Sequence, residues 1–351
     1  MNNLASVHKP LRLVKPIGWA GHIPFAFWIT GNLHPEIFVE LGSHSGNSYF
    51  AFCQSVSTNS LSTKCYAVDT WQGDSQAGFY DEDVYHDVAS YNEQHYHTFS
   101  RLLKMRFDEA LPLFSNGSID LLHIDGLHTY DAVRHDFETW LPKMSESGIV
   151  LFHDINVRHD DFGVYRFWEE VSARYPHLAF DHSSGLGVLA VGKKIDPLLA
   201  MMINVFGSEE GALHIKTLFS SLGRILELEW RKENLEYSDT EPNAIHRFHD
   251  ATTSGYRTQP GMLVESSGEI QHFADALKKE AAAQLARADN LHHSIHRITS
   301  STSWKLMLPV RRFSKSLRRK SRKLRKSLFS FISKISPQQQ SPQLTLNSNQ
   351  N

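Results

Sequence analysis

Cysteine is scarce in this sequence: Cys53 and Cys65 are the two cysteines among 351 residues. Two cysteines exclude a small disulfide-stabilised scaffold, and a reducing compartment is the simpler interpretation. Long hydrophobic runs are lacking too, since the partly apolar stretch at 23–30 is far too short to span a bilayer. The sequence therefore predicts a cytoplasmic protein, and its 41% hydrophobic content is enough for a buried core.

The G-x-G-x-x-G spacing that suits a pyrophosphate is missing from the first glycine turn. Instead an apolar strand ends in Glu40, and Gly42 and Gly46 follow at E-x-G-x-x-x-G spacing. Glycine lets the backbone approach a ligand there, and the helix that begins beyond offers free N–H groups. A second apolar run, 65–68, ends at Asp69, where doubly wound folds place the acid that binds ribose hydroxyls. Such a turn suits S-adenosylmethionine, which has no phosphate, better than NAD.

Two further strands continue this pattern. Residues 118–124 and 149–152 are apolar runs, and between them apolar residues recur at intervals of three and four, as in a helix. The first run is followed by Asp-Gly-Leu-His at 125–128, and the second by His-Asp at 153–154. Acids and histidines at strand ends predict an open parallel sheet with a ligand site at its carboxyl edge.

Four segments in this order resemble the class I S-adenosylmethionine-dependent methyltransferases, and within them the family-24-like branch with an I-D-G-x-H-x-Y signature. They are VELGSHSGNS at 39–48, YAVDTWQGD at 66–74, IDLLHIDGLHTYDAVRHDFETWLP at 119–142 and GIVLFHD at 148–154. The branch is often found beside or fused to glycosyltransferases of surface-polysaccharide pathways. The resemblance covers roughly residues 20–193. It implies an α/β fold with a doubly wound, Rossmann-like seven-stranded sheet, closed by an antiparallel hairpin at 178–180 and 187–191.

The resemblance implies S-adenosylmethionine as the cofactor. The Asp69 carboxylate would accept hydrogen bonds from both ribose hydroxyls, and Glu40 would meet the amino-acid end of the cofactor through backbone or water. Plainer alternatives are a salt-bridge or helix-capping role for Glu40 and simple turn roles for the glycines. Trp71 either stacks on adenine or caps the core. The predicted cofactor-binding residues are Glu40, Gly42, Ser43, Gly46, Asp69, Trp71 and Asp125.

Methyl transfer needs an acceptor oxygen near attack distance and a group that takes its proton. The predicted catalytic residues are Asp125, His128 and His153, with His128 as the base; its alternative role is a cap of the following helix. The predicted ligands of Mg²⁺ or another divalent cation are Asp125, Asp154 and His153. The ion would lower the pKa of the acceptor hydroxyl. Related branches carry a second acid where this chain has His153, so metal dependence stays open.

The most probable reaction under this resemblance is O-methylation of a sugar hydroxyl in cell-surface glycan biosynthesis. The segment 73–99, rich in Tyr, His and acids, is expected to be a long loop, either a lid whose aromatic faces suit a carbohydrate or a packed insertion. A non-catalytic scaffold of the same fold, docking to glycosyltransferases or membrane, is the alternative from another class. An NAD(P)-dependent oxidoreductase is disfavoured by the glycine spacing.

Charge is distributed unevenly along the chain. The net charge is -2, but residues 304–351 hold about 12 Lys and Arg and no acid. With hydrophobic residues near one helical face, this basic segment suits an anionic surface such as the inner membrane face, or a protein partner. Nucleic acid is a weaker candidate, and a solvated tail is the plain alternative.

Composition divides the chain into six predicted parts. A predicted methyltransferase domain is followed by a helical C-terminal extension, with either a plain helix or a short coiled coil, and then by the basic segment. The predicted limits are 1–20 for a lead-in, 21–193 for the methyltransferase domain, 194–262 for a helix and polar linker, 263–300 for a helical or coiled-coil segment, 301–335 for the basic amphipathic segment and 336–351 for a disordered tail.

Overall fold

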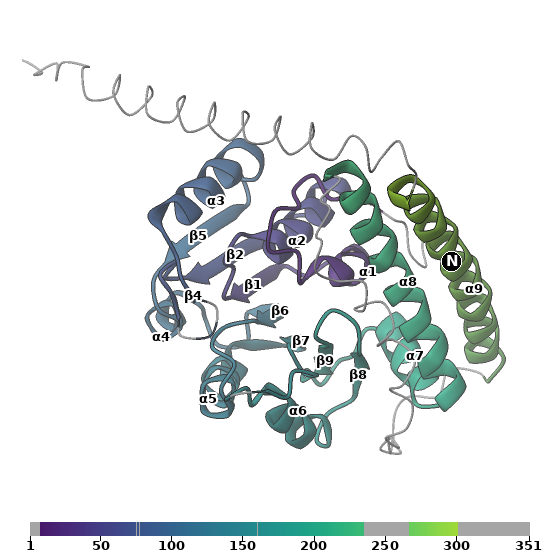
Figure 1. Ribbon diagram of the computed structural model, residues 1–351. Helices are drawn as coiled ribbons and strands as arrows, with labels where there is room; N and C mark the ends of the chain where they lie inside the picture. The colour runs from purple at the N-terminus through teal and green to yellow at the C-terminus, as the bar shows by residue number, and fades with distance from the viewer. Residues whose placement is uncertain (1–7, 75, 77, 160, 235–266, 301–351) are drawn as a thin grey trace, which may run out of the picture. The chain divides into compact units, whose positions relative to one another are not determined.

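The computed structural model describes residues 8–74, 76, 78–159, 161–234 and 267–300. A seven-stranded sheet in the order β5-β2-β1-β6-β7-β9-β8 lies at its centre (Figure 1). The first five strands of this order run parallel, and β9 runs antiparallel to both of its neighbours. The strands are β1 Ile37–Leu41, β2 Lys64–Asp69, β5 Ser100–Lys104, β6 Ile119–Ile124, β7 Met144–His153, β8 His177–Phe180 and β9 Leu186–Ala190. The predicted doubly wound fold and its closing hairpin are confirmed.

Helices cover both faces of the sheet, as its apolar strands require. The central strands β1, β6 and β7 are buried nearly throughout their apolar stretches, because helices pack on either side of them. Figure 1 shows α1, α2 and α8 on one face and α5 and α6 on the other. The helices are α1 Ile23–Leu33, α2 Asn47–Thr58, α3 Glu82–His95, α4 Phe107–Ala110, α5 Tyr130–Trp140, α6 Val164–Ser172, α7 Pro197–Phe206, α8 Glu209–Asn234 and α9 Ser267–Ser300, with 3₁₀ turns at Ala20–His22, Leu111–Leu113 and Leu141–Lys143.

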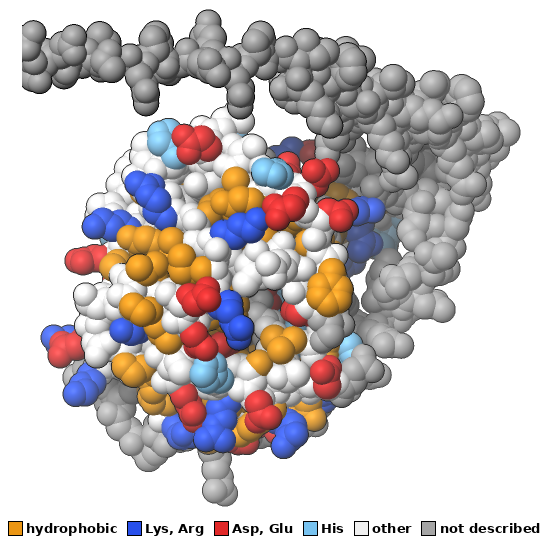
Figure 2. Space-filling view, turned by 90° about the vertical axis from the view of Figure 1, so that its left-hand side faces the viewer, with side chains coloured by type: hydrophobic (Ala, Val, Ile, Leu, Met, Phe, Trp, Pro, Cys, Tyr) orange, Lys and Arg blue, Asp and Glu red, His pale blue; other side chains and the backbone are white. Residues whose placement is uncertain are grey.

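The expectation of a long loop over 73–99 is wrong. A two-stranded hairpin, β3 Gly73–Asp74 and β4 Gly78–Phe79, is followed by the 14-residue helix α3. Only Val88 and Asn92 are buried along this helix, so its apolar pattern in the sequence is weak. On the side of the molecule formed by α3 and β5, acidic, basic and hydrophobic side chains are interspersed (Figure 2).

The helical C-terminal extension is confirmed by α7, α8 and α9. One face of α9 buries Phe273, Leu277 and Ala281, four residues apart, as expected for a packed amphipathic helix. Salt bridges between the helices join Lys278 to Glu210 at 2.8 Å and Arg224 to Asp289 at 2.9 Å. The coiled coil and the residue limits of the six predicted parts of the chain remain predictions.

The chain divides into two compact units, residues 1–292 and 293–351, and the site described below belongs to the first. No helix among the described residues combines the length and apolarity of a membrane span. The predicted basic segment, the predicted disordered tail and most of the polar linker lie outside the described residues.

Asp136 on α5 makes stability depend on pH. The residue is 7% exposed, and burial raises the pKa of its carboxyl to about 7. Because the folded-state pKa lies above the unfolded value, ionisation opposes folding, and stability falls as pH rises from about 4 to about 7. Asp136→Asn should therefore stabilise the protein at about pH 8, by up to about 4 kcal/mol. Urea unfolding at about pH 8 and about pH 5 would test this; a gain of equal size at both pH values would contradict it.

Candidate active site

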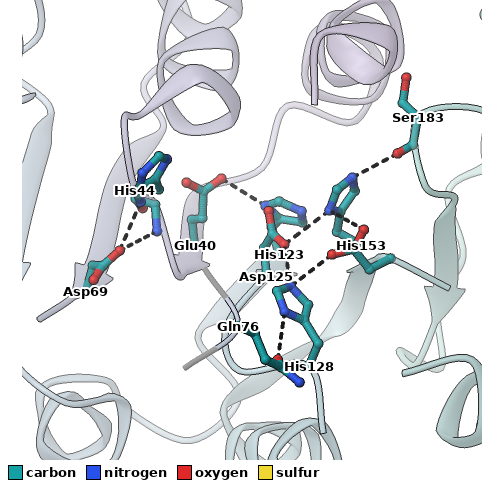
Figure 3. A network of polar contacts seen from close by, with 11 residues as sticks. Glu40, His44, Asp69, Gln76, His123, Asp125, His128, His153 and Ser183 are labelled. Atoms are coloured by element: carbon teal, nitrogen blue, oxygen red, sulfur yellow. Dashed lines mark hydrogen bonds and ion pairs between the residues drawn. The ribbon is translucent and has the colours of Figure 1, made fainter. Parts of the chain in front are cut away.

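The carboxyl ends of four parallel strands meet at one edge of the sheet because the strand register aligns their last residues. Leu41 pairs with Val68 on one side and with Ile124 on the other, and Ile124 pairs with Phe152. Figure 3 shows acids and imidazoles of this edge close together. The residues that follow these four positions are Gly42, Asp69, Asp125 and His153, all of them predicted site residues.

Gly42 allows the glycine loop, residues 42–46, to pack against the end of β6. Its φ of 86° lies in the left-handed region, and its N–H donates to the Val68 carbonyl at 3.0 Å. A Cβ at this position would overlap the backbone carbonyl oxygen of Asp125. The first amides of a helix have no acceptor within the helix. Gly46 is the N-cap of α2 and has no side chain to accept from them, so they remain available to a ligand.

The Asp69 carboxylate holds the glycine loop through backbone amides. Its Oδ2 accepts from the N–H groups of Ser43 at 2.8 Å and His44 at 3.0 Å, and its Oδ1 accepts from Trp71 N–H at 2.7 Å. A carboxylate has about four acceptor positions, so with three amides bound Asp69 keeps about one for a ribose hydroxyl, fewer than the two hydroxyls of the prediction. Its ribose-binding role remains a prediction that this geometry permits.

Trp71 packs in the core. The side chain is 2% exposed, its Nε1 donates to the His44 carbonyl at 2.9 Å, and its ring centroid lies 5.0 Å from that of Tyr85. This arrangement corresponds to the core-capping alternative, because stacking on adenine would require an exposed ring face.

Glu40 and His123 form a buried pair that the sequence did not suggest. Both side chains are fully buried, and Glu40 Oε2 lies 2.8 Å from His123 Nδ1. Burial raises the pKa of Glu40, although the contact with His123 opposes the rise. This contact corresponds to the salt-bridge alternative for Glu40. The other carboxylate oxygen, Oε1, and the other imidazole nitrogen, Nε2 of His123, have no hydrogen-bond partner. The missed signal was register: two residues that pair across parallel strands are neighbours.

Two carboxylates and two imidazoles cluster beside this pair, and the predicted catalytic side chains are all among them. His128 Nε2 lies 2.9 Å from Asp154 Oδ2 and 3.5 Å from Asp125 Oδ1, and is aligned for a hydrogen bond with neither. His153 Nδ1 donates to Asp125 Oδ1 at 3.2 Å and lies 3.4 Å from Asp154 Oδ1. Asp154 has a φ of 61°, a left-handed conformation that turns the chain after β7.

The charges of the cluster stabilise one another. Burial alone would lower the pKa of His128, but the carboxylates of Asp125 and Asp154 outweigh it and raise that pKa to about 9. In the same way, the carboxylates overcome burial and raise the pKa of His153. Burial alone would raise the pKa of both carboxyls, but the neighbouring imidazoles outweigh it. They lower the pKa of Asp154 to about 2 and hold that of Asp125 well below its usual value. A cation that binds His128 must therefore displace a proton.

The group that fits a divalent cation differs in one residue from the predicted ligand set. Ligand atoms of Asp125, His128 and Asp154 all lie within 4.8 Å of one another, whereas the prediction named His153. Both nitrogens of His153 are already engaged, Nδ1 with the carboxylates and Nε2 with the Ser183 carbonyl at 3.1 Å. Two carboxylates and an imidazole suit a divalent ion, and the unaligned Nε2 of His128 is consistent with a shared ligand there.

The helix-capping alternative for His128 is wrong. Thr129 is the N-cap of α5, and its Oγ1 accepts from Ala132 N–H at 3.3 Å. His128 is instead fixed by two residues that the sequence did not suggest: Gln76 Oε1 accepts from its backbone N–H at 2.9 Å, and the Phe162 ring stacks on it with centroids 4.8 Å apart.

Comparison with known proteins finds a methyltransferase domain over the part of the chain that holds these strands. Residues 39–155 match a family model described as a methyltransferase domain, and this range contains every predicted site residue. The chain is 49% identical over 192 residues to the uncharacterized protein y4gI of Sinorhizobium fredii, which covers 55% of this chain. The chain spans 21% of that relative's length. The family match supports a methyltransferase domain in this part of the chain.

Solved methyltransferase structures resemble the chain more distantly. The O-methyltransferase TomG of Streptomyces achromogenes, in complex with S-adenosylmethionine, is 15% identical with a TM-score of 0.38, over 52% of this chain and 82% of that one. The methyltransferase PaMTH1 of Podospora anserina, bound to S-adenosylhomocysteine, is 14% identical with a TM-score of 0.36, over 48% of this chain and 77% of that one. The strand order, rather than these likenesses, establishes the fold.

Proposed function

We propose that the chain is an S-adenosylmethionine-dependent methyltransferase that transfers a methyl group to a hydroxyl oxygen. One observation carries this proposal. The E-x-G-x-x-x-G loop, tied to Asp69 by two backbone amides, lies at the same sheet edge as the group Asp125, His128 and Asp154. The first part suits a phosphate-free adenosyl cofactor, and the second suits an acceptor that must lose a proton.

The side chains have distinct roles in this mechanism. The sulfonium of the cofactor activates its own leaving group, so the protein must align the acceptor oxygen and remove its proton. In the absence of a cation, Nε2 of His128 accepts the proton only when the imidazole is neutral, and its pKa of about 9 makes that form the minority at neutral pH. A divalent cation held by Asp125, His128 and Asp154 would supply Lewis acidity that lowers the pKa of the acceptor hydroxyl. His153 positions both carboxylates.

For the acceptor we propose a sugar hydroxyl, on a glycan destined for the cell surface. An aromatic side chain close to the site supports it: the ring centroid of Tyr80 lies 4.3 Å from that of His44 in the glycine loop. Aromatic faces with polar tips suit a carbohydrate. Docking to glycosyltransferases or to an anionic membrane through the basic segment 301–335 is part of the same proposal, and it rests on the sequence.

Calorimetric titration with S-adenosylmethionine and S-adenosylhomocysteine, with and without Mg²⁺, tests the proposal. Both ligands should bind the wild-type chain, and an effect of Mg²⁺ would support metal ligation. Asp69→Ala should weaken binding by ~1–3 kcal/mol, because it removes charge-assisted hydrogen bonds to the loop and to the ribose. No binding by the wild-type chain in either condition would favour the scaffold alternative.

Asp120 provides a matched control for Asp69. Its Oδ2 accepts from the N–H groups of Glu36 at 2.8 Å and Ile37 at 3.2 Å, so it ties down backbone at the amino edge of the sheet. Asp120→Ala should destabilise the fold without changing cofactor affinity. An unchanged affinity in Asp69→Ala, or an equal loss in both variants, would rule out the ribose role.

A further inference from the structure

The N-terminal strap, residues 8–16, is bound along α2. Gln54 accepts from Leu11 N–H at 2.8 Å and donates to the Lys9 carbonyl at 3.0 Å. Asn47 accepts from Val14 N–H at 3.0 Å and donates to the carbonyls of Val14 at 2.7 Å and Pro16 at 2.8 Å. The two amide side chains lie seven residues apart, on one side of the helix, and hold the strap beside the glycine loop.

Arg12 of this strap reaches the glycine loop itself. Its Nε and Nη2 donate to the Ser45 carbonyl at 3.2 and 3.1 Å, and Nη2 also donates to Asp87 Oδ2 at 2.6 Å. The guanidinium lies 4.9 Å from the ring centroid of Tyr91 on α3 and 5.6 Å from that of Phe50 on α2. Only 7% of the Arg12 side chain is exposed. One cation therefore joins the strap, the loop, α2 and α3.

The glycine loop is thus held from two sides by charged groups. Asp69 accepts from amides of Ser43 and His44, while Arg12 donates to the carbonyl of the next residue, Ser45. The exposed Asp87 contributes little to the energy of this arrangement, because a largely solvated ion pair is weak. The charge-assisted bonds to the carbonyl and the stacking on Tyr91 are stronger, and a planar guanidinium makes both at once.

We propose that Arg12 is a positioning residue of the cofactor site, which fixes the carbonyl of Ser45 and so keeps the glycine loop in the form that binds the cofactor. This inference rests on the proposed function for the identity of the ligand, but its claim about the loop does not. A role confined to fold stability would lower the melting temperature and leave the affinity of the folded protein unchanged. A positioning role changes the affinity and the dynamics of the loop.

Arg12→Met tests the inference in the full chain, because Met retains an unbranched apolar stem and lacks the donors. Calorimetry should show S-adenosylhomocysteine binding weakened about tenfold, and amide hydrogen exchange at 43–48 should be faster in the ligand-free protein. Arg12→Lys keeps the charge and should show a smaller loss of affinity. It replaces Arg12→Met in the test if that variant does not fold. Lys9→Met is the matched control, since Lys9 is an exposed strap cation that pairs with Glu233 instead of the loop; it should change neither quantity.

The outcomes separate this inference from the proposed function. Unchanged exchange and unchanged affinity in both Arg12 variants, at temperatures where they are folded, would overturn the positioning role. Faster exchange in a chain whose wild type binds no S-adenosylhomocysteine would support the control of the loop by Arg12 and refute the proposed cofactor. Equal effects of Arg12→Met and Lys9→Met would assign the role to the strap as a whole and overturn the assignment to Arg12.

Discussion

Asp125→Asn should lower kcat by about 10³-fold, the largest effect that we expect from one substitution in this chain. The Oδ1 of Asp125 lies within reach of both imidazoles, 3.2 Å from His153 and 3.5 Å from His128. Asparagine keeps the shape but removes the negative charge that keeps both imidazoles basic and that would bind a cation. Steady-state kinetics at several Mg²⁺ concentrations, together with S-adenosylhomocysteine titration, would separate the catalytic loss from any loss of cofactor affinity.

Asp131→Asn is the control for this change. Asp131 lies in the first turn of α5, three residues after His128 in the chain, and is exposed to solvent. Its neutralisation should leave kcat within about twofold of the wild-type value, as for ordinary surface substitutions. A kcat in Asp125→Asn within about tenfold of wild type would exclude this carboxylate from the reaction.

Gly42→Ala should have the second-largest effect, on stability and cofactor binding together. With φ at 86°, alanine would adopt a left-handed conformation at a cost of roughly 1–2 kcal/mol. Its Cβ would also overlap the Asp125 carbonyl oxygen, so the loop would have to move away from β6. We expect a total destabilisation of about 3 kcal/mol or more in urea unfolding, and a loss of detectable S-adenosylhomocysteine binding.

Gly117→Ala isolates the contribution of the close approach. Gly117 has a similar φ of 72°, but a Cβ there would meet no atom within 4 Å. Gly117→Ala should lower the free energy of unfolding only by the cost of the left-handed conformation, about 1 kcal/mol, and should bind cofactor normally. Equal destabilisation in the two variants would show that φ alone explains the requirement for glycine at Gly42.

The prediction of the sheet succeeded because its strands leave a local signal. Uninterrupted apolar runs such as 149–152, which lies between Gly148 and His153, are typical of strands covered on both faces, and the structure places β7 there. The helix α3 left no such signal. Only Val88 and Asn92 are buried along it, and its aromatic residue Tyr91 packs on Phe50, which lies far away in the sequence.

The lead-in before residue 20 shows a second limit of local reasoning. Nothing in its composition distinguished Arg12 from other surface cations, because its partners Ser45 and Tyr91 come from the glycine loop and from α3. The same limit hid Gln76, whose contact with His128 joins a hairpin to the end of β6.

The sequence by itself determined which residues reach the carboxyl edge, since alternation, glycine spacing and strand ends depend on neighbours along the chain. Tertiary structure decided what each side chain faces there. It turned Trp71 into the core, paired Glu40 with His123, and brought His128 rather than His153 into the group that fits a cation. The physical reason is that side-chain direction at a strand end depends on packing between distant segments, which no local pattern of residues specifies.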